Sequence, residues 1–337
     1  MSDSMTGVEG ANVAPVRTHD LTKEYDGRVT VNRVNLTVRP GEIYGFLGPN
    51  GAGKTTTIRM LLGLLRPTAG RVELFGQDLD QAGPELRERI GVMGEHAYLY
   101  DDMTALEYLD FFARFYRVPE RASRCRELLE RLDLGPFADL RARDFSQGMQ
   151  RKLSLARAVL HDPALLILDE PVSGLDPYGI VQVRELLDER RAAGCAVFVS
   201  SHILSEVERT ADRVGVIHRG RLLLEDSVDR VVGKLTTGLE VALELETAVP
   251  GLTLDLGQLP GVRITRDEGR VIVLHLDAEP TRSTVSQCVT RAGGVVVGMT
   301  VRRATLEEAF IQLTEGKLEQ AGLVGGQDAK ARASHEQ

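Results

Sequence analysis

The sequence predicts an α/β fold with a largely parallel sheet, a helical insertion inside that fold, and a small α+β domain after it. From Val16 to about Leu224, short apolar runs alternate with longer helical patterns, which is typical of parallel strands joined by helices. Residues 104–160 instead carry apolar side chains at helical spacing. After Gly233, apolar and acidic residues alternate, which indicates a second domain that begins with a half-buried strand.

The chain has 337 residues, enough for about two domains at ~150 residues each. We expect a flexible lead over residues 1–14 and an α/β domain over 15–230, whose helical part covers about 100–160. A small α+β domain is expected over 236–314, within the usual size range of domains. Residues 315–337 are polar and predict a disordered tail.

Composition and charge argue against several classes of protein. Lys and Arg total 41 against 49 for Asp and Glu, a formal charge of −8, which is a poor match for a nucleic-acid partner. No apolar run approaches the ~20 residues of a membrane-spanning helix, and the N-terminus does not resemble a secretory signal. Cys125, Cys195 and Cys288 match no metal-binding or disulfide pattern, so we expect reduced thiols in a cytoplasmic protein.

Three buried strands are expected in the larger domain, at Ile43–Leu47, 165–168 and 196–200, with a helix over 54–65 after the first. Each strand is a brief apolar run followed by turn residues. Two helical stripes mark the insertion, and Gly135 and Pro136 end them. The stripes are Leu106, Leu109, Phe112, Ala113 and Tyr116, and then Leu128, Leu129 and Leu132.

The smaller domain has its own alternating and helical patterns. Val241, Leu243 and Leu245 alternate with glutamates as in a half-buried strand. A second strand is expected at Val271–Leu276, a helix over 281–292 and a third strand over 295–301. A last helical stripe comprises Leu306, Ala309, Phe310 and Leu313.

A phosphate-binding loop follows the first buried strand. Residues 48–55 match G-x-x-x-x-G-K-[ST] at every fixed position and open the helical pattern, which is the context that this motif requires. Its glycines let backbone N–H groups converge on phosphate oxygens at a helix N-terminus. Lys54 would neutralise the β- and γ-phosphates, and the Thr55 hydroxyl would bind Mg²⁺. The candidate nucleotide-binding residues here are Gly48, Pro49, Asn50, Gly51, Ala52, Gly53, Lys54, Thr55 and Thr56.

Two carboxylates end the second buried strand, and a histidine follows the third. In a parallel sheet these ends lie at the ligand crevice, so Asp169 is placed to hold Mg²⁺ and Glu170 to polarise the attacking water. His202 is placed to hydrogen-bond the γ-phosphate. Taken alone, each pattern also fits a solvated turn or a surface histidine, and it is the phosphate loop that favours chemistry. Glu170, His202 and Lys54 are therefore the candidate catalytic residues.

With three further motifs in place, the chain resembles the nucleotide-binding subunit of an ABC transporter. Residues 144–151, Asp-Phe-Ser-Gln-Gly-Met-Gln-Arg, stand where that family has its signature sequence, ahead of a helix over 152–160. Residues 173–176, Ser-Gly-Leu-Asp, match its D-loop, and Ser201-His202 its H-loop. Tyr25, 23 residues before Gly48, stands where the family places a ring that stacks on adenine, although an ordinary exposed tyrosine remains the alternative.

The resemblance implies a P-loop NTPase fold, ATP and Mg²⁺ as ligands, and a head-to-tail dimer. In such a dimer, ATP held by residues 48–56 of one subunit is closed over by Ser146 and Gly148 of the other, and Asp176 lies at the interface. The sequence departs from the family's pattern at two positions. Gln147 replaces a glycine of the common signature, and Glu95 stands at the Q-loop position that usually carries a metal-contacting glutamine. A glutamate there can still reach the metal ion or its water, so the resemblance implies Glu95 as a metal-site residue beside Thr55 and Asp169, with an added negative charge.

At both positions the sequence is similar to the bacterial drug-exporter branch of the family, which includes daunorubicin-resistance pumps. The stretches 98–104, 107–116 and 305–314 are also similar to that branch. The resemblance implies a separate permease of the ABC-2 type and a homodimer, or a heterodimer with a related chain, at the inner face of the cell membrane. It implies export of a drug or another hydrophobic compound, driven by ATP hydrolysis.

Two other functions stay open at this point. One is an ABC ATPase that acts on ribosomes or DNA, although such proteins usually carry two cassettes or long insertions. The other is an importer ATPase, in which an extra C-terminal domain often senses a regulator. The transported substrate is not encoded here, because its contacts lie in the membrane subunit.

Overall fold

The computed structural model describes residues 13–235, 239–277, 281–302, 305–308 and 310. The chain divides into two compact units, with the boundary between Ser227 and Val228. The expected lead over 1–14 lies outside the described residues except for its last two, and the expected tail over 315–337 lies wholly outside them. No helix within the described ranges has the length and apolar character that crossing a membrane requires.

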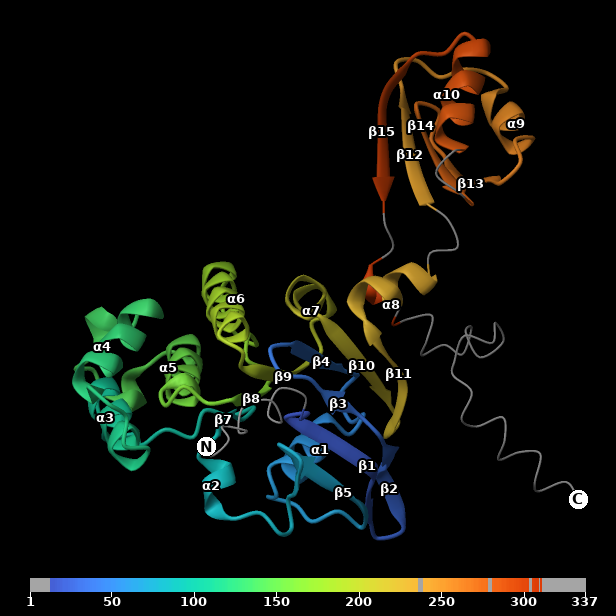
Figure 1. Cartoon of the computed structure of the whole chain (residues 1–337). Helices are drawn as coiled ribbons and strands as arrows, with labels where there is room; N and C mark the ends of the chain where they lie inside the picture. Colours follow the sequence, from blue (N-terminus) through green and yellow to red (C-terminus); the bar gives the residue numbers. More distant parts are fainter. Residues whose placement is uncertain (1–12, 236–238, 278–280, 303–304, 309, 311–337) are drawn as a thin grey trace, which may run out of the picture. The chain divides into compact units, whose positions relative to one another are not determined.

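A six-stranded sheet forms the centre of the first unit (Figure 1). Its strands are parallel except for the edge strand β11, which pairs antiparallel with β10. Every residue of the three expected strands, now β4, β8 and β9, is buried, as in a sheet covered on both faces. In spatial order the strands are β11 (Arg221–Ser227), β10 (Arg213–His218), β4 (Ile43–Leu47), β9 (Ala196–Ser201), β8 (Leu165–Asp169) and β7 (Ile90–Met93).

A second, antiparallel sheet also belongs to this unit, and it was not predicted from the sequence. Its strands are half polar, so they lack the apolar runs that mark β4 and β8. The two-residue Asp26-Gly27 turn between Tyr25 and Arg28, with positive φ at both positions, is a hairpin signal that the sequence did contain. The strands are β1 (Val16–Tyr25), β2 (Arg28–Val34), β3 (Thr37–Val38), β5 (Ala69–Leu74) and β6 (Gln77–Asp78).

Helices cover the six-stranded sheet and connect its strands. They are α1 (Lys54–Leu61), α2 (Pro84–Arg87), α6 (Pro177–Ala192) and α7 (Leu204–Thr210). The first of them ends four residues earlier than the predicted Leu65. Gly63 adopts a φ of +67°, and the Arg59 carbonyl accepts the N–H groups of Leu64 and Leu65, which is a glycine-terminated helix end.

The helical insertion is present and lies at one end of the first unit (Figure 1). It contains α3 (Ala105–Phe115), α4 (Arg121–Arg131) and α5 (Gln147–Val159), with short 3₁₀ turns at Gly135–Phe137 and Ala142–Asp144. Tyr108, Leu128 and Leu153 are among the side chains of its shared core. A capping box of Thr104 and Glu107 begins α3. The prediction that a helix follows the signature over 152–160 was wrong at its start, because α5 begins at Gln147 with Ser146 as its N-cap.

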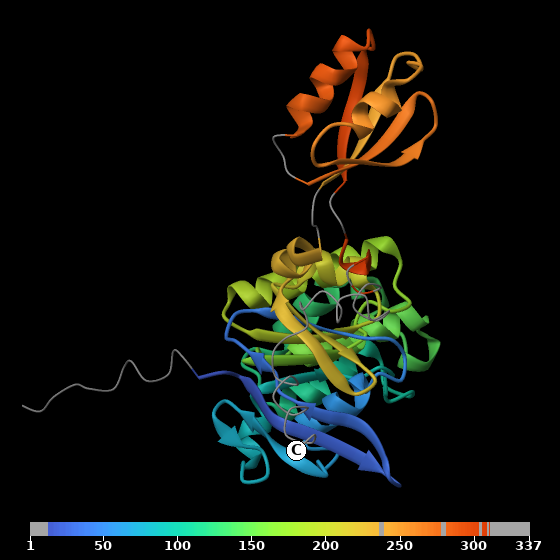
Figure 2. The same ribbon diagram turned by 90° about the vertical axis from the view of Figure 1, so that its right-hand side faces the viewer.

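In the second unit, α9 and α10 pack on one face of an antiparallel sheet (Figures 1 and 2). Its described strands run in the order β13 (Val262–Asp267), β14 (Val271–Leu276), β12 (Leu239–Leu245) and β15 (Val296–Arg302). Its described helices include α8 (Val228–Leu235), α9 (Leu252–Gly257) and α10 (Thr281–Arg291), and neither α9 nor β13 was predicted from the sequence. Leu306 of the last stripe is buried, whereas Ala309 and Leu313 lie outside the described residues.

Candidate active site

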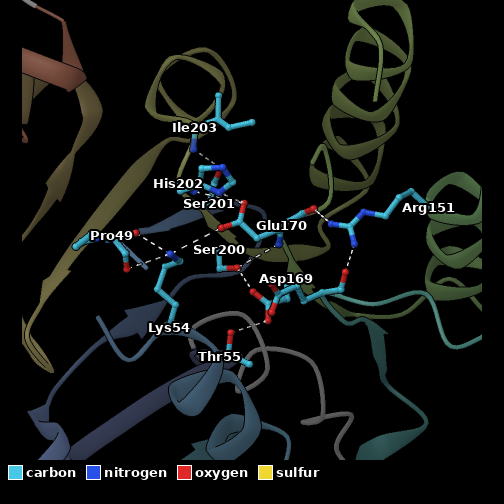
Figure 3. A network of polar contacts seen from close by, with 12 residues as sticks. Pro49, Lys54, Thr55, Arg151, Asp169, Glu170, Ser200, Ser201, His202 and Ile203 are labelled. Atoms are coloured by element: carbon cyan, nitrogen blue, oxygen red, sulfur yellow. Dashed lines mark hydrogen bonds and ion pairs between the residues drawn. The ribbon is translucent and has the colours of Figure 1, made fainter. Parts of the chain in front are cut away.

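The candidate site lies at the carboxyl edge of the six-stranded sheet, where β4, β9 and β8 are neighbours. β4 leads into the glycine-rich loop and α1, β8 ends at Asp169, and His202 follows β9. Because neighbouring parallel strands end at the same edge, three segments far apart in the sequence meet here (Figure 3).

The glycine-rich loop has no room for side chains at two positions. A Cβ atom on Gly48 would lie 2.4 Å from the Ile217 carbonyl oxygen, and one on Gly53 would lie 2.8 Å from the Thr30 carbonyl oxygen. Gly53 also has a φ of +109°, which favours glycine. The backbone N–H groups of this loop are therefore not covered by side chains at these two positions, at the N-terminus of α1. Such an arrangement suits the binding of the phosphate groups of a nucleotide.

A cleft lies beside this loop, and most of the predicted site residues line it. Its lining comprises Thr30, Pro49, Asn50, Gly51, Gly53, Lys54, Thr55, Thr56, Glu95, Asp169 and Glu170. Lys54 is 7% exposed and donates a 2.6 Å hydrogen bond to the Gly48 carbonyl oxygen, and its Nζ lies 3.8 Å from Glu170 Oε1. The Lys54 ammonium is thus held between the loop and the carboxylate.

Asp169 and Thr55 form an oxygen-rich corner of the cleft. The Thr55 hydroxyl donates to Asp169 Oδ2 at 3.2 Å, and the Ser200 hydroxyl donates to Asp169 Oδ1. Hydroxyl and carboxylate oxygens are the ligands that Mg²⁺ prefers. Among the described residues, no group of three or more His, Cys, Asp or Glu side chains is arranged to hold a metal ion by itself.

Glu170 lies between Lys54 and His202. Its carboxylate Oε2 is 2.8 Å from His202 Nδ1, and the side chain of His202 is 47% exposed whereas that of Glu170 is 9% exposed. The Glu170 backbone has a φ of +52°, and its N–H donates to the Ser200 carbonyl oxygen at 3.1 Å. A buried carboxylate beside a phosphate-binding lysine can orient a water molecule and accept its proton.

Three residues of the site were not predicted from the sequence. Ser200 bonds Asp169, Thr30 lines the cleft, and Arg151 donates from Nη1 to the Glu95 carbonyl and from Nη2 to the Glu170 carbonyl. Burial lowers the pKa of Arg151, while the nearby carboxylates oppose that shift. One sequence feature could have indicated Arg151. It is a basic residue at a position that faces the core in the helix after the signature, where an apolar side chain would be expected.

Seven predicted residues, all of them described, are not among those that line this cleft. Gly48, Ala52 and His202 adjoin it, through the loop itself or through the contact of His202 with Glu170. The other four lie elsewhere. Tyr25 is 44% exposed at the end of β1, with Lys23 Nζ 5.1 Å from its ring centroid. Ser146 caps α5, and Asp176 caps α6 by accepting from the Gly179 N–H at 2.9 Å. A Cβ atom on Gly148 would meet only ordinary contacts, at 3.6 Å from Leu175 Cδ2. Within one subunit, therefore, Ser146 and Asp176 have capping roles and Gly148 has no steric need to be glycine.

The glycine loop, the paired strand-end carboxylates and the parallel sheet define the chain as a P-loop nucleotide hydrolase. Residues 31–173 match the family model described as ABC transporter. The chain belongs to the ABC transporter family, as an ATP-binding subunit with ATPase activity. The predicted family, fold class and enzyme class are thereby confirmed.

Two relatives and one solved structure illustrate this similarity. The bacitracin transport ATP-binding protein BcrA of Bacillus licheniformis is 37% identical, over 89% of this chain and 97% of that protein. The daunorubicin resistance ATP-binding protein DrrA3 of Streptomyces coeruleorubidus is 35% identical, over 93% and 97%. A dimeric post-hydrolysis structure of the ATP-binding cassette MJ0796 with ADP and Pi has a TM-score of 0.59 and 25% identity, over 63% of this chain and 98% of that one.

Proposed function

We propose that this ATPase subunit powers the export of a drug or another hydrophobic compound, with Glu170 as the residue that activates water. One observation carries the assignment of the site. The buried Glu170 carboxylate lies at the glycine-loop cleft, 3.8 Å from Lys54 Nζ and 2.8 Å from His202 Nδ1. It is therefore next to the place where the loop and Lys54 would hold the terminal phosphate.

In the proposed reaction, a water oxygen attacks the γ-phosphorus of ATP and the bond to the leaving ADP breaks. Glu170 orients that water and accepts its proton, while the loop N–H groups and Lys54 stabilise the charge on the phosphate oxygens. His202 holds the Glu170 carboxylate and offers a further donor to the γ-phosphate. Thr55 and Asp169 would hold Mg²⁺, with Glu95 beside them, and the ion supplies charge neutralisation on the β- and γ-phosphates.

The complete site is proposed to need two subunits, either identical or related. Gly148 supports this proposal, because nothing in its own chain requires a glycine there. An absent Cβ would let the N-terminal turn of α5 approach the γ-phosphate bound to the other copy, with Ser146 beside it and Asp176 at the interface. Tyr25 would stack on adenine, which its exposed position at the end of β1 permits.

We also propose a separate membrane permease of the ABC-2 type as the partner, with the chain at the inner face of the membrane. Names of relatives for bacitracin transport and daunorubicin resistance support outward movement of a toxic compound. Exposed aromatic side chains before and along α3 offer an apolar surface to such a partner, with Tyr98 81% and Phe115 69% exposed.

Reconstitution with the permease tests the transport proposal. The chain and the permease from the same operon would be placed in inside-out vesicles and assayed with candidate compounds. We expect ATP-dependent accumulation of a compound inside the vesicles, which corresponds to export, together with stimulated ATPase activity. Movement in the opposite direction would support an importer, and ATPase activity stimulated by ribosomes or DNA instead would contradict transport.

A further inference from the structure

Arg151 is a buried charged residue at the end of the signature segment, and the roles proposed for that segment do not use it. It lies in α5, five positions after the N-cap Ser146, and is 5% exposed. Burying a charge is unfavourable unless its hydrogen bonds are satisfied. Among the described residues of the first unit, the other buried charged side chains are Lys54, Asp169 and Glu170 at the cleft and Glu42, which pairs with Arg213. The partners of Arg151 therefore indicate what its burial achieves.

Both partners of Arg151 are main-chain carbonyls of residues that line the cleft. Nη1 donates to the Glu95 carbonyl, and Nη2 donates to the Glu170 carbonyl, a bond that Figure 3 shows as a dashed line. The planar guanidinium carries several donors in a fixed fork, so one side chain can hold two loops at a set separation. A lysine, with a single nitrogen, cannot reproduce this arrangement.

The contact matters most for the main chain of Glu170. That residue has a φ of +52°, a conformation that is unfavourable for residues other than glycine and that persists only when its surroundings enforce it. Its N–H is held by the Ser200 carbonyl at 3.1 Å, and its C=O is held by Arg151. These two bonds fix the backbone on both sides of the Cα atom, and so they fix the direction in which the carboxylate leaves the chain.

We propose that Arg151 is a positioning residue that aims the Glu170 carboxylate at the reacting water and ties this aim to the loop that carries Glu95. The proposal rests on the proposed role of Glu170. It follows that α5, which Ser146 caps and whose first turn carries Gly148, is connected through Arg151 to the water-activating residue of its own subunit.

Arg157 provides a matched control on the same helix. Its Nη2 donates to the Val92 carbonyl at 2.9 Å, and its Nη1 donates to the Tyr108 hydroxyl at 3.2 Å. It therefore also joins α5 to a main-chain carbonyl. That carbonyl belongs to the strand β7 and not to the cleft, so its loss tests the general effect of removing a half-buried arginine.

The first experiment compares Arg151→Met, Arg151→Lys and Arg157→Met in the full chain, by steady-state ATP hydrolysis. Arg151→Met should lower kcat about 10- to 100-fold, because a misdirected base loses near-attack geometry. Its KM for ATP should stay within about twofold, since Lys54 and the glycine loop are unchanged. Arg157→Met should keep kcat within about twofold. A normal kcat for Arg151→Met, or an equal fall in Arg157→Met, would overturn the proposal.

Arg151→Lys keeps the charge but places all of its donors on a single nitrogen, so it protects the test against a Met variant that fails to fold. We expect its melting temperature to be near that of the wild type and its kcat to be reduced, and a folded Arg151→Lys with normal kcat would contradict the proposal.

The second experiment repeats Arg151→Met in a Glu170→Gln background by single-turnover hydrolysis. If Arg151 acts through Glu170, the added change should lower the residual rate by less than about twofold.

The outcomes separate this inference from the function on which it rests. A full additive loss in the double variant shows that Arg151 does not act through Glu170. If Glu170→Gln hydrolyses ATP slowly but Arg151→Met hydrolyses it normally, the positioning role of Arg151 is contradicted and the proposed role of Glu170 stands. Normal turnover in Glu170→Gln removes the proposed role of Glu170 itself.

Discussion

Lys54 and Glu170 are a buried pair of opposite charges at the point where phosphate would bind. Their atoms are 3.8 Å apart, and both side chains are less than a tenth exposed. In such a place each charge compensates part of the desolvation of the other, so removal of one leaves the other unpaired. Substitutions here change both chemistry and stability, and each test therefore needs a binding measurement beside the rate.

Replacing Lys54 with Ala should lower both ATP affinity and turnover, because the lysine interacts with phosphate in the ground state and in the transition state. An equilibrium titration with labelled ATP measures the affinity. Lys152→Ala is the matched control, since the Lys152 ammonium bonds Gln182 at 2.6 Å and does not line the cleft. Unchanged ATP affinity in Lys54→Ala would count against the assignment.

Tyr25→Ala should weaken ATP binding by roughly 1–3 kcal/mol, which is the value of stacking one base on an aromatic ring. Tyr25→Phe keeps the ring and should bind ATP as the wild type does. The same titration measures both variants. If Tyr25→Ala binds ATP normally, then another group stacks the adenine and Tyr25 is an ordinary exposed residue at the β1–β2 turn.

At the scale of elements, α5 joins the two halves of the proposed site. Its first turn carries the signature residues, and its second turn carries Arg151. The Gln147 side chain lies beside Gly174 of the D-loop, where a Cβ atom would be 3.5 Å from Gln147 Cδ. The signature and the D-loop are thus neighbours within one subunit, and both are available to a second copy.

Gly148 and Gln147 should respond in opposite ways to substitution. Gly148→Asp fits within its own subunit, so the chain should fold and bind ATP at its own loop. Hydrolysis should be abolished, because a carboxylate would repel the phosphate held by the partner. Gln147→Gly should keep most activity, because glycine is the residue of the common signature at this position and the Gln147 side chain is exposed. ATPase assays with both variants decide the matter, and normal turnover in Gly148→Asp would contradict action across the dimer.

Mixing Gly148→Asp subunits with Lys54→Ala subunits gives a sharper form of this test. One site of the mixed dimer carries both lesions and the other carries neither. We expect ATP trapping to return in the mixture at up to one site per dimer, whereas each variant alone traps none. If mixing restores no trapping although mixed dimers form, the signature does not act on the partner's nucleotide.

The sequence predicted best those elements whose burial is complete. β4, β8 and β9 are buried at every position and read as apolar runs, whereas β1, β2 and β5 are half polar and pair over long distances, such as Val16 with Leu74. The contiguous phosphate loop was likewise predictable from local sequence. Arg151 and Ser200 were not, because their roles exist only after folding brings separate segments together.

At the scale of the whole molecule, each proposed ATP site combines the glycine loop of one subunit with the signature of another. The first unit of a single chain therefore supplies only half of a site, and two copies are needed for a complete one. ATP binding should therefore promote dimerisation, and hydrolysis should release it. Blocking hydrolysis without blocking binding should leave ATP-bound dimers as the main species.

Glu170→Gln tests this account most directly, because glutamine keeps the size and hydrogen bonding of the side chain but cannot accept the proton. ATP affinity, single-turnover hydrolysis and dimer content would be measured on the same full-length preparation. We expect ATP binding to survive, hydrolysis to fall by at least ~100-fold, and dimers to accumulate with ATP. Near-normal hydrolysis by Glu170→Gln, with ATP binding intact, would contradict the assignment of Glu170 and with it the proposed mechanism.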